Sequence, residues 1–376
     1  MSPTPPAMTT VREINAIGEL EPYRSVWTEL LNRTKDASFF QTLEWLELYW
    51  KYYGSDKKLR VLLILEKDAV QGIVPLLVLR DTTRIGPIRF LTYPLSSWGS
   101  FYGPIGPSPE LLLTAALNHI RQTPKDWDVL ELRFVDVEGT DGGATERALK
   151  TAGLKAYRTT QGEASLIDMS MSWNDFLASK SKNWRKSYHS WERKLKQQGD
   201  LQFIRHRPRG EAHGDSDPRW DLYDACLAIS EKSWQSASPD GTTLCHPEVR
   251  EFLRETHAVA ARLGAADLTL LLLNGIPLAF GYNYYWNRNL VGLRVGYDPL
   301  TAPKSGAGSL LKAYIVRDGC DRGDLVYDMG PGSMDIKRQL RTRTATIFRY
   351  SHFKSLSPRL QLMRLKRWFD QKRKST

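Results

Sequence analysis

Hydrophobic and polar positions alternate along the first 150 residues with the periods of strands and helices. Apolar runs of strand length at 59–66 and 70–79 are separated by Lys67-Asp68-Ala69, a stretch that favours a turn. Leu112, Ala116 and Ile120 recur at helical spacing within 109–121. The other elements predicted here are helices at 40–53 and 144–151 and strands at 88–93, 97–102 and 129–135.

The second half of the chain repeats this order. An apolar strand at 268–273 leads into Asn274-Gly275, a strong hairpin signal because both residues tolerate positive φ. The elements predicted after it are strands at 276–286 and 290–297, a helix at 309–321 and a strand at 325–329. Both halves contain a strand, a turn and a strand with a small residue near its start, which indicates an internal duplication.

A basic amphipathic helix is predicted between the two halves. Trp184, Tyr188, Trp191 and Leu195 share one face of it, and Gly199 ends it. The domain boundary is expected at 161–164. The segments predicted on this basis are a disordered lead at 1–12, a first domain at 13–163, a second at 164–353 and a basic amphipathic tail at 354–376.

Composition excludes several classes of protein. With 41% hydrophobic residues and 12 tryptophans among 376 residues, the chain is expected to fold. Its three cysteines contain no CxxC pair and its seven histidines show no ligand spacing, so neither a disulfide framework nor a metal site is expected. A reducing, cytoplasmic location fits this cysteine usage. No apolar run has the length of a membrane span.

The net charge of +11 is concentrated in two segments. Lys180–Lys196 carries +6 and Ser351–Thr376 carries +7, so the rest of the chain carries only −2. A protein that coats a nucleic-acid duplex more often spreads its basic residues across a face. Two local patches instead suit a phosphate-bearing ligand or an anionic surface.

One glycine-rich loop is a candidate phosphate site. It follows a strand and opens an apolar helix, where backbone amides lack partners and the helix dipole is positive. Lys304 adds a charge beside it, although a plain tight turn explains the same residues. The loop is neither a P-loop nor a dinucleotide fingerprint. The predicted phosphate-binding residues are Lys304, Ser305, Gly306, Ala307, Gly308, Ser309 and Leu310.

The corresponding loop of the first half, YGPIGPSPELLL, is a poor phosphate cradle. Pro104, Pro107 and Pro109 have no N–H to donate. If one half binds a cofactor, the second half is therefore expected to do so.

Three stretches of the second half resemble a known family. NGIPLAFGYNYY, GYDPLTAPKSGAGSLL and YDMGPGSMDIKRQ are similar to GNAT-type acyltransferases of the cellulose-biosynthesis (CelD/BcsL) kind, relatives of the Fem peptidyl transferases. FLASKSKNWRKSYHSWERKLKQQG resembles the basic helix that opens the second domain in that group, and ISEKSWQ at 229–235 also fits.

The resemblance implies an α/β fold made of two tandem GNAT folds, with mixed, mostly antiparallel sheets flanked by helices. It implies a degenerate first domain and a second domain that binds acyl-CoA, with the pyrophosphate on the amides from Ser305 to Leu310. Pro303 and Ile336 depart from the family pattern, which often has Gln or Arg at the first position and Tyr at the second.

N-acyl transfer from a thioester needs a neutral amine, a polarised carbonyl and a proton for the thiolate. Asp328 ends a predicted strand and is expected to bind or deprotonate the acceptor amine, or else to cap a turn. Tyr297 is a candidate proton donor and His246 a candidate base, although both suit structural roles. The candidate substrate-binding residues, each of which also fits a core or solvated position, are Arg185, Trp234, Arg294 and Lys337.

The leading hypothesis is an acyl-CoA-dependent N-acyltransferase without a metal, whose acceptor is an amine of an envelope, polysaccharide or lipid precursor, for example a long-chain base. It needs no nucleic acid. The basic tail favours contact with an anionic membrane at the inner face, or else docks on its domain. The alternatives are a Fem-like transferase that uses aminoacyl-tRNA, and a non-catalytic GNAT scaffold that binds no CoA.

Overall fold

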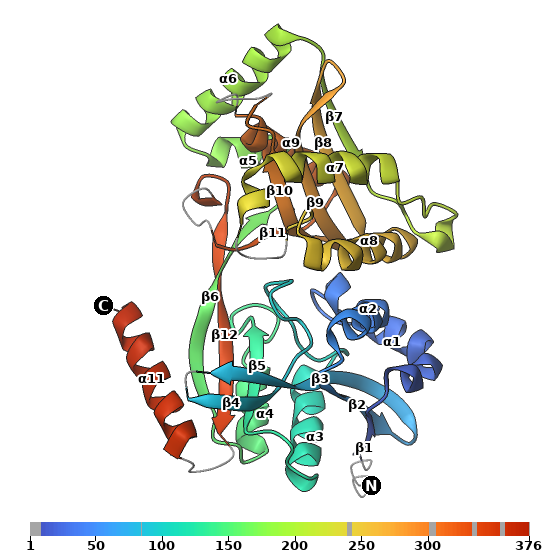
Figure 1. Cartoon of the computed structure of the whole chain (residues 1–376), viewed down its shortest axis with the longest axis vertical. Coiled ribbons are helices and arrows are strands. Elements are labelled where there is room, and N and C mark those ends of the chain that lie inside the picture. Colours follow the sequence, from blue (N-terminus) through green and yellow to red (C-terminus); the bar gives the residue numbers. More distant parts are fainter. Residues whose placement is uncertain are drawn as a thin grey trace, which may run out of the picture. The chain divides into compact units, whose positions relative to one another are not determined.

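The computed structural model describes residues 9–83, 85–238, 243–300, 306–332, 337–353 and 358–375. They form two compact units, Met1–Glu163 with Ala345–Thr376 and Ala164–Thr344, called unit 1 and unit 2 below (Figure 1). Lys304 and Ser305, two of the predicted phosphate-binding residues, lie outside the described residues.

Unit 1 is a sheet with the strand order β1-β2-β3-β4-β5-β12. Its pairs are antiparallel except for β4 and β5, which run parallel through Phe90↔Val129 and Leu91↔Leu130. Helix α3 makes the crossover between these two strands. The elements are β1 Thr9–Ile14, η1 Ile17–Tyr23, α1 Arg24–Asn32, η2 Phe39–Gln41, α2 Leu43–Tyr53, β2 Lys58–Glu66, β3 Ala69–Thr83, β4 Gly86–Thr92, α3 Pro109–Gln122, β5 Val129–Val135, α4 Ala144–Thr151, β12 Arg343–Phe353 and α11 Pro358–Ser375.

Unit 2 repeats this topology with the strand order β6-β11-β10-β9-β8-β7. Its single parallel pair among the described residues, β10 with β11, is again joined through a helix, α9. The elements are β6 Tyr157–Asp168, α5 Trp173–Ser179, α6 Lys182–Gln198, β7 Leu201–His206, η3 Glu211–His213, α7 Trp220–Lys232, η4 Trp234–Ala237, α8 Pro247–Arg262, β8 Ala266–Leu273, β9 Ile276–Trp286, β10 Asn289–Tyr297, α9 Ala307–Arg322 and β11 Val326–Pro331.

The two units exchange their last strands. β6 follows the elements of unit 1 in sequence, but its residues Ala164–Asp168 pair with β11 of unit 2. β12 follows the elements of unit 2, but Phe348–Phe353 pair with β5 of unit 1. Unit 1 is therefore made of two separate stretches of chain, whereas unit 2 is the continuous segment Ala164–Thr344.

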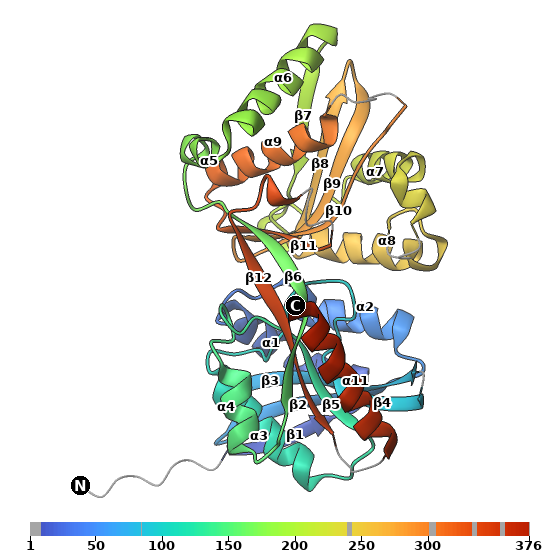
Figure 2. The same cartoon turned by 90° about the vertical axis from the view of Figure 1, so that its left-hand side faces the viewer.

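The sheet of unit 2 lies between two helical layers. Figure 2 shows α5, α6 and α9 on one face of β7–β10 and α7 and α8 on the other. Trp184, Tyr188 and Leu195 of α6 pack with Leu310 and Leu311 of α9 in one buried cluster. The predicted apolar face of the basic helix is confirmed, since these residues are buried while Lys182, Lys186, Arg193, Lys194 and Lys196 are exposed.

Local signals explain most element boundaries. Asn274 and Gly275 have φ of 52° and 78°, which closes the β8–β9 hairpin as predicted. The predicted helix at 40–53 begins only at Leu43, because the side chain of Thr42 accepts the amide of Trp45 as an N-cap.

Two predictions for unit 1 are wrong. Residues 97–102 form no strand; Ser96 has a φ of 53°, and the ring of Trp98 lies against that of Trp45 at 6.1 Å in the α2 core. The disordered lead predicted for residues 1–12 is wrong for residues 9–12, because Thr9–Ile14 pair with β2 as strand β1.

The C-terminal helix docks on unit 1. Leu360 and Met363 of α11 pack with Ile88, Phe90 and Val129. On the same face of α11, Arg367 donates to the buried carboxylate of Glu131, and Arg364 lies over the ring of Tyr157 at 4.1 Å. Docking was one of the two outcomes expected for this tail.

Candidate functional site

The site is built where β10 and β11 separate. The two strands pair in parallel for three residues, from Asn289↔Val326 to Val291↔Asp328. β10 then bulges between Gly292 and Arg294 and stays on β9, whereas β11 turns away and pairs with Ala164 of β6 at Pro331. The carboxyl ends of two parallel strands therefore form a wedge at one edge of the sheet.

Asp328 and Lys337 lie on the β11 side of this wedge. Asp328 is 7% exposed, and its Oδ1 accepts the amide of Gly330 at 2.7 Å. Lys337 donates from Nζ to the carbonyls of Gly330 and Pro331 at 2.9 and 2.8 Å. The Asp328 carboxylate thus caps a turn, which is the alternative role that the sequence predicted for it. Lys337 binds the last two residues of β11.

The charges around Lys337 come from three elements. Burial lowers the pKa of Lys337 to about 8; the Asp328 carboxylate opposes this change, and the cations Lys312 and Arg294 add to it. Burial also lowers the pKa of Lys312. The structure therefore brings together three of the predicted residues, Asp328, Lys337 and Arg294. It adds Lys312, which lies one turn after Gly308 on α9.

Helix α9 begins at the same edge of the sheet, because it follows the carboxyl end of β10. Its N-cap, Gly306, has a φ of 77°, and a Cβ there would lie 2.3 Å from Cδ1 of Trp191. Position 306 thus requires a residue without a side chain, because the indole of Trp191 in α6 lies against it. This contact also places the basic helix α6 beside the start of α9.

The first turn of α9 leaves few amides available. The amides of Ser309 and Leu310 both donate to the Gly306 carbonyl, at 3.0 and 2.9 Å. Ala307 and Leu310 are buried, whereas Gly308 is partly exposed. Tyr297, which is 43% exposed, lies against Gly308, since a Cβ at Gly308 would be 3.3 Å from its ring.

The other predicted site residues lie apart from this cluster. His246 is the N-cap of α8, and its Nδ1 accepts the amide of Glu248 at 3.4 Å. Arg185 donates to the carbonyl of Ala178 at the end of α5, at 2.9 Å. Both contacts give these side chains structural roles.

Trp234 is the first residue of the short helix η4, and 59% of its surface is exposed. Its neighbour Gln235 is buried and donates to the carbonyl of Val295 in β10 at 3.1 Å. The short helix η4 is therefore fixed beside the carboxyl half of β10 while the indole faces solvent.

Unit 1 fills the equivalent positions with its own groups. The amide of Tyr102 donates to the Phe134 carbonyl of β5, and the rings of Tyr93 and Tyr102 lie 5.2 Å apart. In the loop before α3, the amide of Gly106 donates to Oγ1 of Thr34 at 2.8 Å. The corresponding wedge and loop are thus occupied by protein.

Comparisons with known proteins agree with this architecture. Residues 182–338 match the model of the acetyltransferase (GNAT) domain family. The fold is similar to that of FemX, with a TM-score of 0.60 and 12% identity over 92% of this chain and 98% of that one. No curated protein matches the sequence.

Two further solved structures have a similar fold. A conserved protein of unknown function from Bacteroides thetaiotaomicron has a TM-score of 0.55 and 12% identity over 92% of this chain and 100% of that one. L-PGS from Bacillus licheniformis has a TM-score of 0.50 and 14% identity over 86% and 96%. Identities this low show the fold alone.

The predicted fold class is confirmed: the chain is α/β and consists of tandem GNAT folds with mixed, mostly antiparallel sheets flanked by helices. The narrower resemblance to the CelD/BcsL family stays a prediction. Among the described residues, no helix has the length and apolarity to cross a membrane, and no group of three His, Cys, Asp or Glu side chains is placed to hold a metal ion.

Replacing Lys337 with Met is expected to change the pH dependence of stability. The folded pKa of about 8 lies below the ordinary 10.5, so between these values the unfolded chain binds the proton more strongly. The free energy of unfolding of the wild type, relative to Lys337→Met, should therefore rise from about pH 8 to 10.5. Urea titrations across this range measure it, with Lys196→Met as an exposed control. A difference that does not vary with pH would contradict the burial of this ammonium group.

Proposed function

We propose that this chain is an N-acyltransferase that moves an acyl group from acyl-CoA to an amine of an envelope, polysaccharide or lipid precursor. The observation that carries the proposal is the wedge between β10 and β11, with the start of α9 at its edge and Asp328 inside it. An extended thioester can lie between diverging strands and take hydrogen bonds from backbone groups that no longer pair. The helix start then supplies amides for the pyrophosphate.

In this proposal the cofactor site consists of Gly308 and the residues around it. Since Ser309 and Leu310 already donate within α9, the amide of Gly308 is the donor we assign to a phosphate oxygen. Lys304 and Ser305 complete the predicted cradle from the sequence, and the exposed basic side chains of α6 add charge beside it.

The proposed chemistry uses Asp328 as proton acceptor. The neutral amine attacks the thioester carbonyl, the C–N bond forms, the C–S bond breaks, and the amine proton passes to Asp328. Lys337 interacts with that carboxylate, and Arg294 adds positive charge near Lys337. Tyr297, which lies against Gly308, is the residue we assign as proton donor to the departing thiolate. No covalent enzyme intermediate is needed.

The exposed indole of Trp234 supports an acceptor with an apolar part. A long-chain base, whose acylation gives a ceramide-type amide, fits such a surface. His246 and Arg185 have structural contacts of their own and receive no role in this mechanism.

Replacing Gly308 with Pro tests the cofactor site. Proline removes the amide donor but suits the first turn of a helix, so α9 should persist. We expect affinity for CoA and palmitoyl-CoA, measured by calorimetry, to fall about tenfold or more. Gly308→Ala keeps the N–H and is the matched control, which should bind nearly as the wild type does.

Failure of the wild type to bind any CoA would overturn the acyl-CoA proposal. The Fem-like alternative, favoured by the similarity to FemX and the exposed basic face of α6, then predicts binding of aminoacyl-tRNA that weakens steeply as salt rises. A scaffold would bind neither CoA nor tRNA.

Replacing Asp328 with Asn tests the proton acceptor. Asparagine keeps an oxygen that can accept the amide of Gly330, so the turn should remain intact while the base is lost. Turnover of acyl-CoA with a long-chain base is expected to fall about a hundredfold or more, with CoA affinity unchanged. Asp221→Asn, an exposed change on α7, serves as the control. Unchanged turnover in Asp328→Asn would remove this residue from the mechanism.

We also propose that α11 holds the chain on an anionic membrane surface. Leu362, Leu365 and Phe369 lie on the face of α11 opposite Leu360 and Met363, and are 58%, 53% and 52% exposed. The segment Ser351–Thr376 that contains them carries a net charge of +7. Exposed apolar side chains with basic residues around them are typical of helices that lie in a lipid interface.

The triple variant Leu362→Ser/Leu365→Ser/Phe369→Ser is expected to lose membrane binding. Cosedimentation with vesicles that contain about one third anionic lipid should show partitioning about tenfold weaker than the wild type. The melting temperature should change little, because the docked face is untouched. Leu111→Ser, at another exposed leucine of unit 1, should bind normally. Equal partitioning of the triple variant and the wild type would contradict this assignment.

A further inference from the structure

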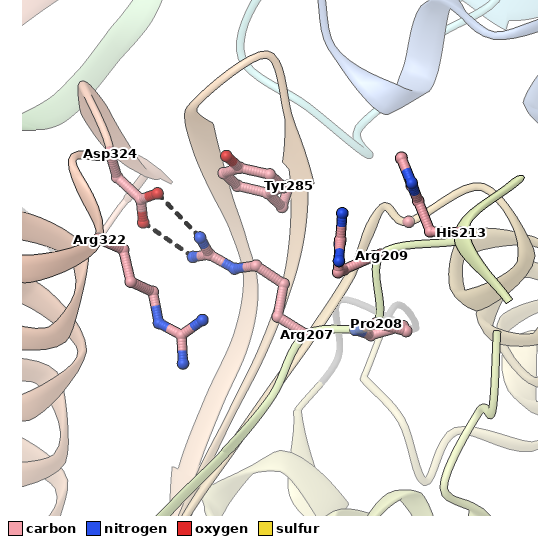
Figure 3. A pocket seen from close by; sticks show the side chains of 8 residues that line it. Arg207, Pro208, Arg209, His213, Tyr285, Arg322 and Asp324 are labelled. Carbon is pink, nitrogen blue, oxygen red and sulfur yellow. Dashed lines mark hydrogen bonds and ion pairs between the residues drawn. The ribbon is translucent and has the colours of Figure 1, made fainter. Parts of the chain in front are cut away.

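A cavity lies in unit 2, at the end of α9 opposite the proposed cofactor site. The helix spans Ala307–Arg322, so roughly 22 Å separate its two ends. The cavity has a volume of about 430 Å³ and is open to solvent (Figure 3). The residues that line it are Arg207, Pro208, Arg209, His213, Gly264, Tyr285, Arg322 and Asp324.

The floor of the cavity is a fixed arginine. Arg207 donates from both Nη atoms to Asp324 at 2.8 Å and from Nε to Asp267 at 2.7 Å, and both aspartates are almost fully buried. Its guanidinium also lies over the ring of Tyr285 at 4.0 Å. Three of its five N–H groups are used, so two donors are left in a rigid orientation.

The carboxylates of this region are already used by other arginines. Asp267 also accepts from Arg205 at 2.8 Å, and Asp318 accepts from Arg205 at 2.9 Å and from Arg322 at 2.6 Å. Three aspartates therefore balance three arginines: Asp267, Asp318 and Asp324 against Arg205, Arg207 and Arg322.

Arg209 adds a positive charge beyond this balance, and the imidazole of His213 adds a further hydrogen-bonding group. Within the described ranges, no carboxylate pairs with either side chain, and the nearby Asp215 binds the backbone amide of Arg209 at 2.9 Å. Figure 3 shows both side chains on the same side of the cavity, with Arg209 between His213 and Tyr285. The carbonyl end of α9 is covered as well, because Arg288 donates to the Gly323 carbonyl at 2.8 Å.

The wall that carries Arg209 is built by two glycines in close backbone contact. Gly210 and Gly264 have φ of 93° and 73°, and a Cβ on Gly264 would lie 2.7 Å from the carbonyl oxygen of Arg209. Any side chain there would be strained and would push the loop outward. The position of the backbone at Arg209 is thus set by this contact between glycines.

We propose that this cavity binds a small molecule that carries a phosphate group. A phosphate brings a charge of about −1.5 to −2 and several acceptor oxygens, which match the guanidinium of Arg209, the imidazole of His213 and the remaining N–H groups of Arg207. The volume lies in the range of small-molecule sites, about 300–1,000 Å³. The site is separate from the wedge and does not depend on the proposed acyl-CoA function.

Protection of Arg209 from phenylglyoxal tests the site directly. The full chain is labelled with increasing inorganic pyrophosphate, at constant ionic strength, and modified arginines are mapped by mass spectrometry. We expect labelling of Arg209 to slow at saturation while that of Arg33, an exposed arginine of unit 1, stays constant. Vesicles that contain phosphatidic acid form a second arm, which protects Arg209 only if the phosphate belongs to a lipid headgroup.

Two variants separate this site from the cofactor site. Arg209→Ala/His213→Ala alters exposed side chains and should weaken pyrophosphate binding about tenfold or more. In Gly308→Pro, pyrophosphate should protect Arg209 as in the wild type, whatever happens to CoA binding. The proposal would be overturned if neither pyrophosphate nor phosphatidic acid changed the labelling rate of Arg209. Protection of Arg209 by sulfate as strong as that by pyrophosphate would also overturn it. So would protection that disappears in Gly308→Pro.

Discussion

The short parallel pairing of β10 with β11 is the constraint on which unit 2 depends. A parallel connection needs a crossover, and α9 provides it, so the start of this helix must lie at the carboxyl edge of the strands. Pairing stops at Val291↔Asp328 because β10 bulges towards β9 while β11 continues onto β6. The wedge, the helix start and the carboxylate of Asp328 are therefore consequences of one topological arrangement.

The same topology in unit 1 leads to a closed arrangement. There the loop before α3 donates its amides to Thr34 and Ile73, and Tyr102 binds the end of β5. Two copies of one fold can thus differ in the partners of the backbone groups where the parallel strands separate. In one copy these groups bond to side chains and loops, and in the other they remain available to a ligand. This difference supports the assignment of ligand binding to unit 2 under the function we propose.

Each unit contains a buried carboxylate that is paired with several arginines. In unit 2, Asp267 and its arginines form a buried network in which burial would raise the pKa of the carboxyl, but Arg205 and Arg207 lower it to about 2. In unit 1, burial acts on Glu131 in the same direction, and Arg133, Arg367 and Arg349 lower its pKa. The second network ties α11 to its sheet. In the part of the tail that the structure describes, α11 is thus partly a structural element of unit 1, and its exposed apolar side chains lie on the opposite face.

The sequence by itself determined what depends on local chemistry. Periodicity and turn residues predicted β5, α4, the Asn274-Gly275 hairpin and the face of α6, because each is set within one helix turn or one strand pair. They also identified Asp328, Lys337 and Arg294, but as separate candidates. The tertiary structure alone decided that these three meet with Lys312, that Trp191 lies on Gly306, and that β6 and β12 are exchanged between units. Contacts between residues far apart in the chain depend on how the sheets pair and the helices pack, and no local pattern records that.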